Sequence, residues 1–180
     1  MPAASAAAPS PAPKPAAAKT YSWRYAEARK ESEAGPLGHA AGSLFSSRGI
    51  EPGDFIYIVA VHRGQLYLLG KMQVGKIVSK DEARRILGDE PYDAPEHLIA
   101  SACTTAQLTE VPVTVAKELR FIGGSRKERL AFREEDILAP QTIRVIRELD
   151  PESASRLDDL LGEMMAFVPP GPSTQRHGGG

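Results

Sequence analysis

The chain of 180 residues has a single cysteine, Cys103, so it cannot form an intramolecular disulfide. It also lacks a Cys-x-x-Cys pair and any cluster of cysteine and histidine with the spacing of a structural zinc site. Such sparing use of cysteine is typical of a reducing compartment. We therefore expect a cytoplasmic protein that folds without a disulfide, a metal or a cofactor, and a buried, unreactive Cys103.

Long apolar runs are missing as well: no stretch of 18 apolar residues occurs, so we expect no membrane-spanning segment. Residues 1–19 lack the apolar stretch found in secretory signals. Their Ala/Pro composition predicts a disordered tail, and residues 168–180 (VPPGPSTQRHGGG) predict a second one. Residues 20–167 remain, which is enough for one domain with a self-sufficient core.

Neither sign of charge dominates, since the formal net charge is −1 at pH 7. The charge is nevertheless unevenly distributed along the chain. Residues 20–88 carry ten Lys/Arg and seven Asp/Glu, a net +3, whereas residues 134–163 carry three and nine, a net −6. A basic body beside an acidic segment permits an anionic partner, although solvated charge on an ordinary surface gives the same pattern.

The clearest strand in the sequence is the apolar, β-branched run at 55–61 (FIYIVAV), which is typical of the middle of a sheet. A Pro-Gly-Asp turn at 52–54 precedes it. A polar turn follows it, so residues 66–78 are expected to return as an antiparallel partner strand. Gly70 and Gly75 lie inside that partner, where glycines are typical of bends or bulges.

Local patterns predict further elements around this hairpin. Ser79 begins a capping box that predicts a helix, and Asp150 followed by proline predicts the start of another. The expected elements are strands at 21–25, 98–105, 111–121 and 130–132, a loop at 26–43 that leaves room for a short helix before Gly35, and helices at 79–87, 140–149 and 151–164. Strands and helices do not alternate regularly, so the pattern favours an α+β fold, a small and mostly antiparallel β-barrel with flanking helices.

The part of the chain around Trp23 resembles a known family. An early aromatic strand carrying Trp23 is followed by a loop rich in glycine and serine at 42–49 (GSLFSSRG) and by the Pro-Gly-Asp turn. The partner strand then ends in residues 72–78 (MQVGKIV), ahead of a helix. Over about residues 21–87 this arrangement resembles the PUA-like superfamily, especially its EVE, ASCH and YTH-type domains, and the resemblance implies a PUA-like β-barrel.

Domains of this superfamily bind RNA, or DNA and RNA with modified bases, in an aromatic pocket with basic residues outside it. The physical need is general: an unstacked base requires an aromatic or apolar surface and hydrogen bonds to its edge, and phosphates require Lys or Arg. The resemblance therefore implies a nucleic acid or a modified nucleobase as the partner. The candidate binding residues are Trp23, Tyr25, His39, Phe45, Ser46, Ser47 and Arg48.

The sequence leaves alternative roles open for these candidates. Trp23 is either a stacking wall or part of the core, and His39 and Arg48 lie where polar side chains are often only solvated. The alternative functions are a hydrolase acting on RNA or nucleotides and a module that binds a protein partner. An enzyme should bring at least two ionisable residues into one cleft, and the sequence shows no such pair, which favours binding over catalysis.

Overall fold

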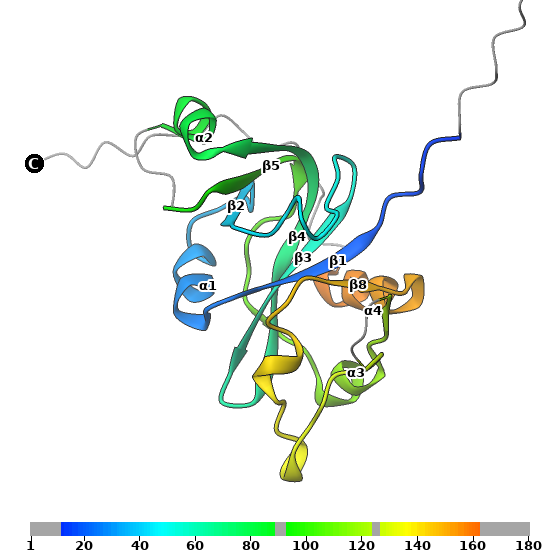
Figure 1. Ribbon diagram of the computed structural model, residues 1–180. Helices are drawn as coiled ribbons and strands as arrows, with labels where there is room; N and C mark the ends of the chain where they lie inside the picture. Colours follow the sequence, from blue (N-terminus) through cyan, green and yellow to red (C-terminus); the bar gives the residue numbers. More distant parts are fainter. Residues whose placement is uncertain (1–11, 89–92, 124–126, 163–180) are drawn as a thin grey trace, which may run out of the picture.

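The computed structural model describes residues 12–88, 93–123 and 127–162, which form one sheet with helices on both sides (Figure 1). The strands are β1 (Ala18–Trp23), β2 (His39–Gly42), β3 (Phe55–His62), β4 (Gln65–Ser79), β5 (Glu96–Cys103), β6 (Thr109–Glu110), β7 (Phe121–Ile122) and β8 (Arg147–Leu149). The helices are α1 (Tyr25–Glu31), α2 (Lys80–Leu87), α3 (Val113–Glu118) and α4 (Pro151–Leu161), and 3₁₀ turns span Glu134–Asp136 and Pro140–Thr142.

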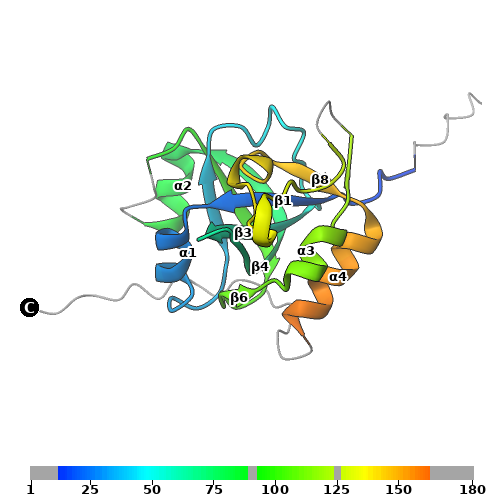
Figure 2. The ribbon, with the colours of Figure 1, turned by 90° about the horizontal axis from the view of Figure 1, so that it is seen from below.

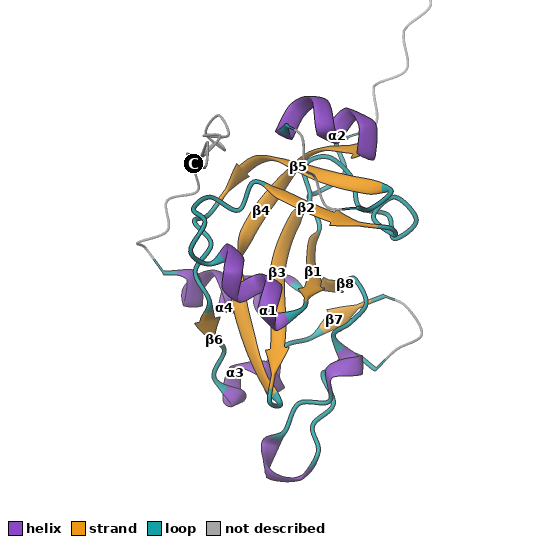
Figure 3. Ribbon diagram, turned by 90° about the vertical axis from the view of Figure 1, so that its left-hand side faces the viewer, coloured by secondary structure: helices purple, strands orange, loops and turns teal. Residues whose placement is uncertain are grey.

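The strands follow one path in the order β2-β5-β4-β3-β1-β8-β7, with β6 paired to β4. Among the described strands β1 and β3 run parallel and the other pairs are antiparallel. The two ends of the path, β2 and β7, are not paired with each other in this part of the chain, so the sheet is open (Figure 3). The predicted α+β class with a mostly antiparallel sheet is confirmed, whereas closure into a barrel is not seen.

The predicted hairpin at the centre of the sheet is confirmed, since β3 and β4 are antiparallel neighbours. Its register shifts between Ile58 and Val59, opposite Gly70, and the register between β4 and β5 shifts around Gly75. A Cβ on Gly70 would lie 2.6 Å from the hydroxyl of Thr104, so a larger residue does not fit there. The two glycines therefore lie at irregularities of the sheet, as the sequence predicts.

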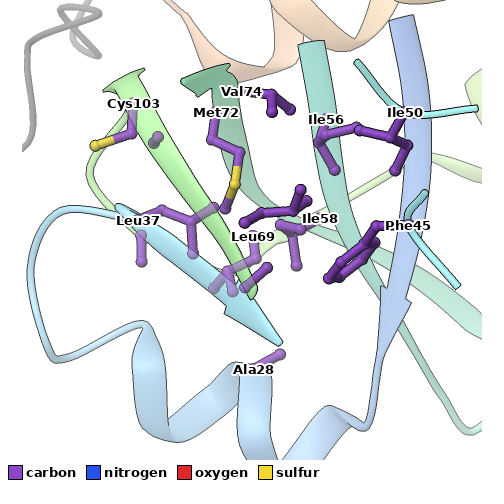
Figure 4. Close-up of a cluster of buried hydrophobic side chains, with 14 of the residues drawn as sticks. Ala28, Leu37, Phe45, Ile50, Ile56, Ile58, Leu69, Met72, Val74 and Cys103 are labelled. Carbon is purple, nitrogen blue, oxygen red and sulfur yellow. The ribbon is translucent and has the colours of Figure 1, made fainter. Parts of the chain in front are cut away.

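Strand β3 separates two hydrophobic cores. Ile56 and Ile58 belong to a first core that also contains residues of α1 and β5 (Figure 4). Tyr57 and Val59 belong to a second core with residues of α3 and α4. Figure 2 shows β3 and β4 between α1 on one side and α3 and α4 on the other. Both faces of β3 are buried, which explains why its sequence lacks the polar alternation of a half-exposed strand.

The prediction of a strand at 111–121 is wrong, because most of this segment is helix α3 (Val113–Glu118). Pro112 has φ −52° at the N-cap, a value that suits entry into a helix. Ala116 and Leu119 are buried three residues apart, which is the spacing of one helix face. Packing of that face on the second core outweighs the strand preference of the valines.

The helix predicted at 140–149 is also wrong. A 3₁₀ turn begins the segment and strand β8 ends it, pairing with both β1 and β7. The buried Arg147 donates hydrogen bonds to the carbonyls of Thr142 and Lys127 and lies over the ring of Phe121. The strand predicted at 130–132 is reduced to an isolated bridge between Phe132 and Leu138.

The boundaries near the amino terminus also differ from those predicted. Strand β1 begins at Ala18, so the tail predicted at 1–19 extends too far, and the strand predicted at 21–25 ends earlier because Tyr25 opens α1. Within the expected loop at 26–43, α1 is the short helix allowed before Gly35, whereas strand β2 was not predicted. The tail predicted at 168–180 lies outside the described residues.

Both predicted helix caps are present. The Ser79 hydroxyl accepts a hydrogen bond from the backbone N–H of Glu82 at the start of α2. The Asp150 carboxylate accepts one from the N–H of Ser153 at the start of α4, at 2.7 Å. Each cap satisfies a backbone donor that the helix itself leaves without a partner.

Candidate functional site

The junction between β1 and α1 forms the centre of the candidate site. Strand β1 ends at Trp23, Arg24 is extended, and the chain then turns into α1 at Tyr25. Trp23 is half-buried and packs against the first core, so one part of its surface is structural while another part stays accessible. Two hollows share residues 22–24 in their walls.

The first of these, the narrow hollow, has a volume of about 320 Å³. It lies between the end of β1, the first turn of α1, strand β2 and the residues that precede β5. Its lining residues are Tyr21, Ser22, Trp23, Arg24, Glu27, Ala41, Asp93 and Ala94. Two aromatic side chains, one guanidinium and two carboxylates therefore meet around a space at the lower end of the range for small-molecule pockets.

The polar groups of the narrow hollow differ in the hydrogen bonds that they already make within the protein. The Tyr21 hydroxyl donates a 2.7 Å hydrogen bond to the carbonyl of Ala41, and burial raises the pKa of this phenol. The hydrogen bond from Lys80 holds the pKa of the Asp93 carboxyl below its usual range. Asp93 thus presents an ionised acceptor, while Glu27 is an exposed carboxylate in the first turn of α1.

The second space, the wide hollow, has a volume of about 600 Å³. Its lining residues are Ser22, Trp23, Arg24, Tyr25, Val61, Pro140 and Arg144. The Tyr25 ring is stacked on the imidazole of His62, with centroids 4.1 Å apart and planes 14° apart. In contrast to the narrow hollow, the wide hollow has two arginines and no carboxylate among these residues.

His39 lines neither hollow and is paired with another histidine. Its Nε2 lies 2.8 Å from Nδ1 of the buried His97, whose own Nε2 lies 3.0 Å from the carbonyl of Ala94. A carbonyl can only accept, so His97 carries its proton on Nε2 and His39 donates from Nε2. Burial, with a smaller contribution from His97, lowers the pKa of His39 to about 4. The hydrogen bond between the two histidines links β2 to β5.

The loop predicted to border the pocket also lies elsewhere. Phe45 is fully buried in the first core, edge-on to the ring of Tyr21 at 5.0 Å, so it cannot contact a ligand at the surface (Figure 4). The carboxylate of Glu96 accepts the backbone N–H groups of Phe45 and Ser46. Ser47 and Arg48 are exposed, but neither they nor Ser46 line either hollow.

Of the predicted site residues, the structure therefore brings only Trp23 and Tyr25 into the hollows. Sequence reasoning missed the charged residues of the walls, namely Arg24, Glu27, Asp93 and Arg144. The first two follow Trp23 closely in the sequence, and that proximity is a usable signal. The last two approach only through the pairing of distant segments, for which no local pattern exists.

Cys103 is buried, and burial raises the pKa of its thiol, so it is not an activated nucleophile. Within the described residues, His, Cys, Asp and Glu side chains nowhere gather in a group of three that could hold a metal ion. Helices in the same ranges are all too short or too polar to cross a lipid bilayer. Comparisons of the chain with models of known protein families, with curated proteins and with solved structures give no match.

Proposed function

We propose that this protein binds nucleic acid and receives one unstacked base in the narrow hollow beside Trp23. The observation that carries the proposal is the hollow itself, about 320 Å³ in volume with Tyr21 and Trp23 in its wall. A base removed from its stack needs an aromatic surface and hydrogen-bonding groups at its edge, and residues that line the narrow hollow offer both.

The proposal includes the PUA-like architecture that the sequence resembles. A mostly antiparallel sheet with irregularities at Gly70 and Gly75 supports it, because such irregularities curve a sheet. The position of Trp23 supports it too, since this aromatic residue is the last residue of strand β1 and keeps part of its surface accessible.

The charges in the wall favour a base that offers hydrogen-bond donors. Glu27 and Asp93 are carboxylates, which only accept hydrogen bonds when they are ionised. Adenine, cytosine and guanine carry exocyclic amino groups that donate, whereas uracil and thymine have none. We therefore expect a base with an amino group, with or without a modification elsewhere on the ring, to bind better than uracil or thymine.

Trp23→Ala tests the proposal. Loss of the aromatic wall should weaken binding of short single-stranded DNA or RNA by about 1–3 kcal/mol, the usual contribution of one base stacked on an aromatic side chain. The measurement is fluorescence anisotropy of labelled oligonucleotides with and without modified cytosines or adenines. In the unaltered protein, binding should also quench tryptophan emission, which comes from Trp23 alone because the chain has one tryptophan.

Trp23→Phe is the matched control, because it keeps an aromatic face and should retain most of the affinity. If the unaltered protein binds none of the oligonucleotides at high micromolar concentration, the proposal is wrong and a module for a protein partner takes its place. If Trp23→Ala binds as well as Trp23→Phe, the base does not enter the narrow hollow.

A hydrolase acting on RNA or nucleotides is the second candidate, and one observation favours it. The narrow hollow brings Arg24, Glu27 and Asp93 into one cleft, which is the kind of cluster an enzyme requires. The lowered pKa of Asp93 suits a hydrogen-bond acceptor better than a general acid, so binding remains the stronger interpretation. If the protein cleaves the oligonucleotides, and if Glu27→Gln abolishes cleavage without lowering affinity, the hydrolase becomes the stronger interpretation.

A further inference from the structure

We infer that the wide hollow is a phosphate-binding subsite for single-stranded nucleic acid. The inference rests on the proposed function, since it assigns the phosphodiester next to the base that enters the narrow hollow. Residues 22–24 line both hollows, so a nucleotide with its base in the narrow hollow can place its backbone in the adjoining wide hollow.

The two hollows share Arg24 but differ in their other charged residues. The wide hollow is lined by the guanidinium groups of Arg24 and Arg144, both exposed and neither in an ion pair with any described residue. The narrow hollow shares Arg24 with the wide one but adds the carboxylates of Glu27 and of Asp93, which is paired with Lys80, so it suits a phosphate less well. An anionic backbone beside a base with amino groups matches this division, because the anion meets the arginines and the amino group meets the carboxylates.

Long-range pairing holds Arg144 in place. The residue lies between the 3₁₀ turn at Pro140–Thr142 and strand β8, far from Trp23 in the sequence. Pairing of Thr20 with Arg147 fixes β8 beside β1, and the fully buried Ile143 anchors the adjacent backbone in the second core. The position of Arg144 is therefore set by packed neighbours, although its side chain is exposed.

Aromatic groups in the wide hollow indicate how a longer ligand would continue. Tyr25 lines the wide hollow, and its ring is held in place by stacking on His62 and by a tilted contact with Tyr67 at 5.2 Å. Nucleic acid bound as a single strand commonly places successive bases on aromatic faces and its backbone along basic side chains. The subsite therefore predicts that a dinucleotide or longer strand binds better than a nucleoside.

The test compares Arg144→Ala with Arg85→Ala, an exposed arginine on α2 that lines neither hollow. Arg144→Ala should weaken binding of a short single-stranded oligonucleotide by about tenfold, as expected for one lost charged hydrogen bond. It should also reduce the slope of log affinity against log salt by about 0.7, the value for one phosphate of a single strand. Arg85→Ala should change neither quantity.

Binding of the matching nucleoside, which has no phosphate, separates this inference from the proposed function. Arg144→Ala should leave nucleoside binding unchanged, whereas Trp23→Ala should weaken it. If Trp23→Ala weakens binding but Arg144→Ala behaves like Arg85→Ala, the base site stands and the phosphate subsite is wrong. If the unaltered protein binds no oligonucleotide, both are wrong.

Discussion

Lys19 and Asp54 form an ion pair that is buried at the start of β1. Their side chains are 6% and 5% exposed, with 2.9 Å between Nζ and Oδ2. The carboxylate also accepts the backbone N–H groups of Ala17 and Glu51. Burial by itself would raise the pKa of Asp54, but the hydrogen bonds outweigh it and the pKa is lowered. The aspartate of the Pro-Gly-Asp turn thus joins the turn to β1.

Asp54→Asn should lower the free energy of unfolding by about 3 kcal/mol or more, because it leaves the ammonium of Lys19 buried without its counter-charge. Urea unfolding at neutral pH measures the change. Glu51→Gln is the control: its side chain pairs with Lys14 at the surface, where both are more than half exposed, so the loss should stay below about 1 kcal/mol. Equal losses in the two variants would contradict a structural role for the buried pair.

The histidine pair predicts how stability depends on pH. His39 has a pKa of about 4 in the folded protein against 6.5 for an ordinary histidine. Between these values the unfolded chain binds a proton that the folded chain does not, so stability is complete above about pH 6.5 and falls toward pH 4. The loss should amount to about 3 kcal/mol, measured by urea unfolding at a series of pH values.

His39→Gln provides the control for this dependence. Glutamine can still donate to Nδ1 of His97 but does not titrate, so its stability should vary much less between pH 6.5 and 4. An unchanged slope in this variant would assign the acid sensitivity to other groups. The Asp54 carboxyl adds to the loss of stability only below the pKa of an ordinary aspartate, because its own pKa is lowered in the folded protein.

At the scale of elements, helix α4 depends on its first turn. Asp150→Ala removes the side chain that accepts the N–H of Ser153, and it should destabilise the protein by about 1 kcal/mol. Thermal or urea unfolding measures it. Asp159→Ala, an exposed aspartate on the same helix, should stay within about 0.5 kcal/mol of the unaltered protein. A larger effect at position 159 would show that net charge, not the cap, governs the helix.

Elements with a local cause are the ones that the sequence predicts. The hairpin of β3 and β4 follows from an apolar run and a turn, and the caps at Ser79 and Asp150 follow from short side-chain hydrogen bonds. The segments at 113–118 and 147–149 take their structure from distant partners instead, the second core in one case and strand β1 in the other. Local preference carries no information about those partners.

The candidate site divides in the same way. Trp23 was predictable because one tryptophan in an aromatic, alternating strand is a local signal. Phe45 has an equally aromatic context, but it is buried in the core, where it packs against Gly42 and Tyr21. The contact with Gly42 is so close that a Cβ on this glycine would lie 2.8 Å from the Phe45 ring. Arg144 joins the site through β8, which the sequence predicts as helix.

At the scale of the whole molecule, β1 links two halves. On one side it pairs with β3 and so with the central hairpin, and on the other with β8 and the helix that follows. The two cores lie on opposite faces of the same sheet (Figure 2). Trp23 and its hollows lie at the end of this linking strand, so the site draws residues from both halves.

The place of β1 in the sheet has a consequence for synthesis. Its parallel partner begins at Phe55, and its other partner includes Arg147, which is 127 residues away from Thr20. Pairings this distant form slowly, because a long loop must close before any contact stabilises it. During translation β1 leaves the ribosome well before β8, so the edge of β1 that pairs with β8 stays uncovered until residues 147–149 have emerged. The candidate site is thus completed only after β8 pairs with β1, although Trp23 at its centre is made before any residue of β8.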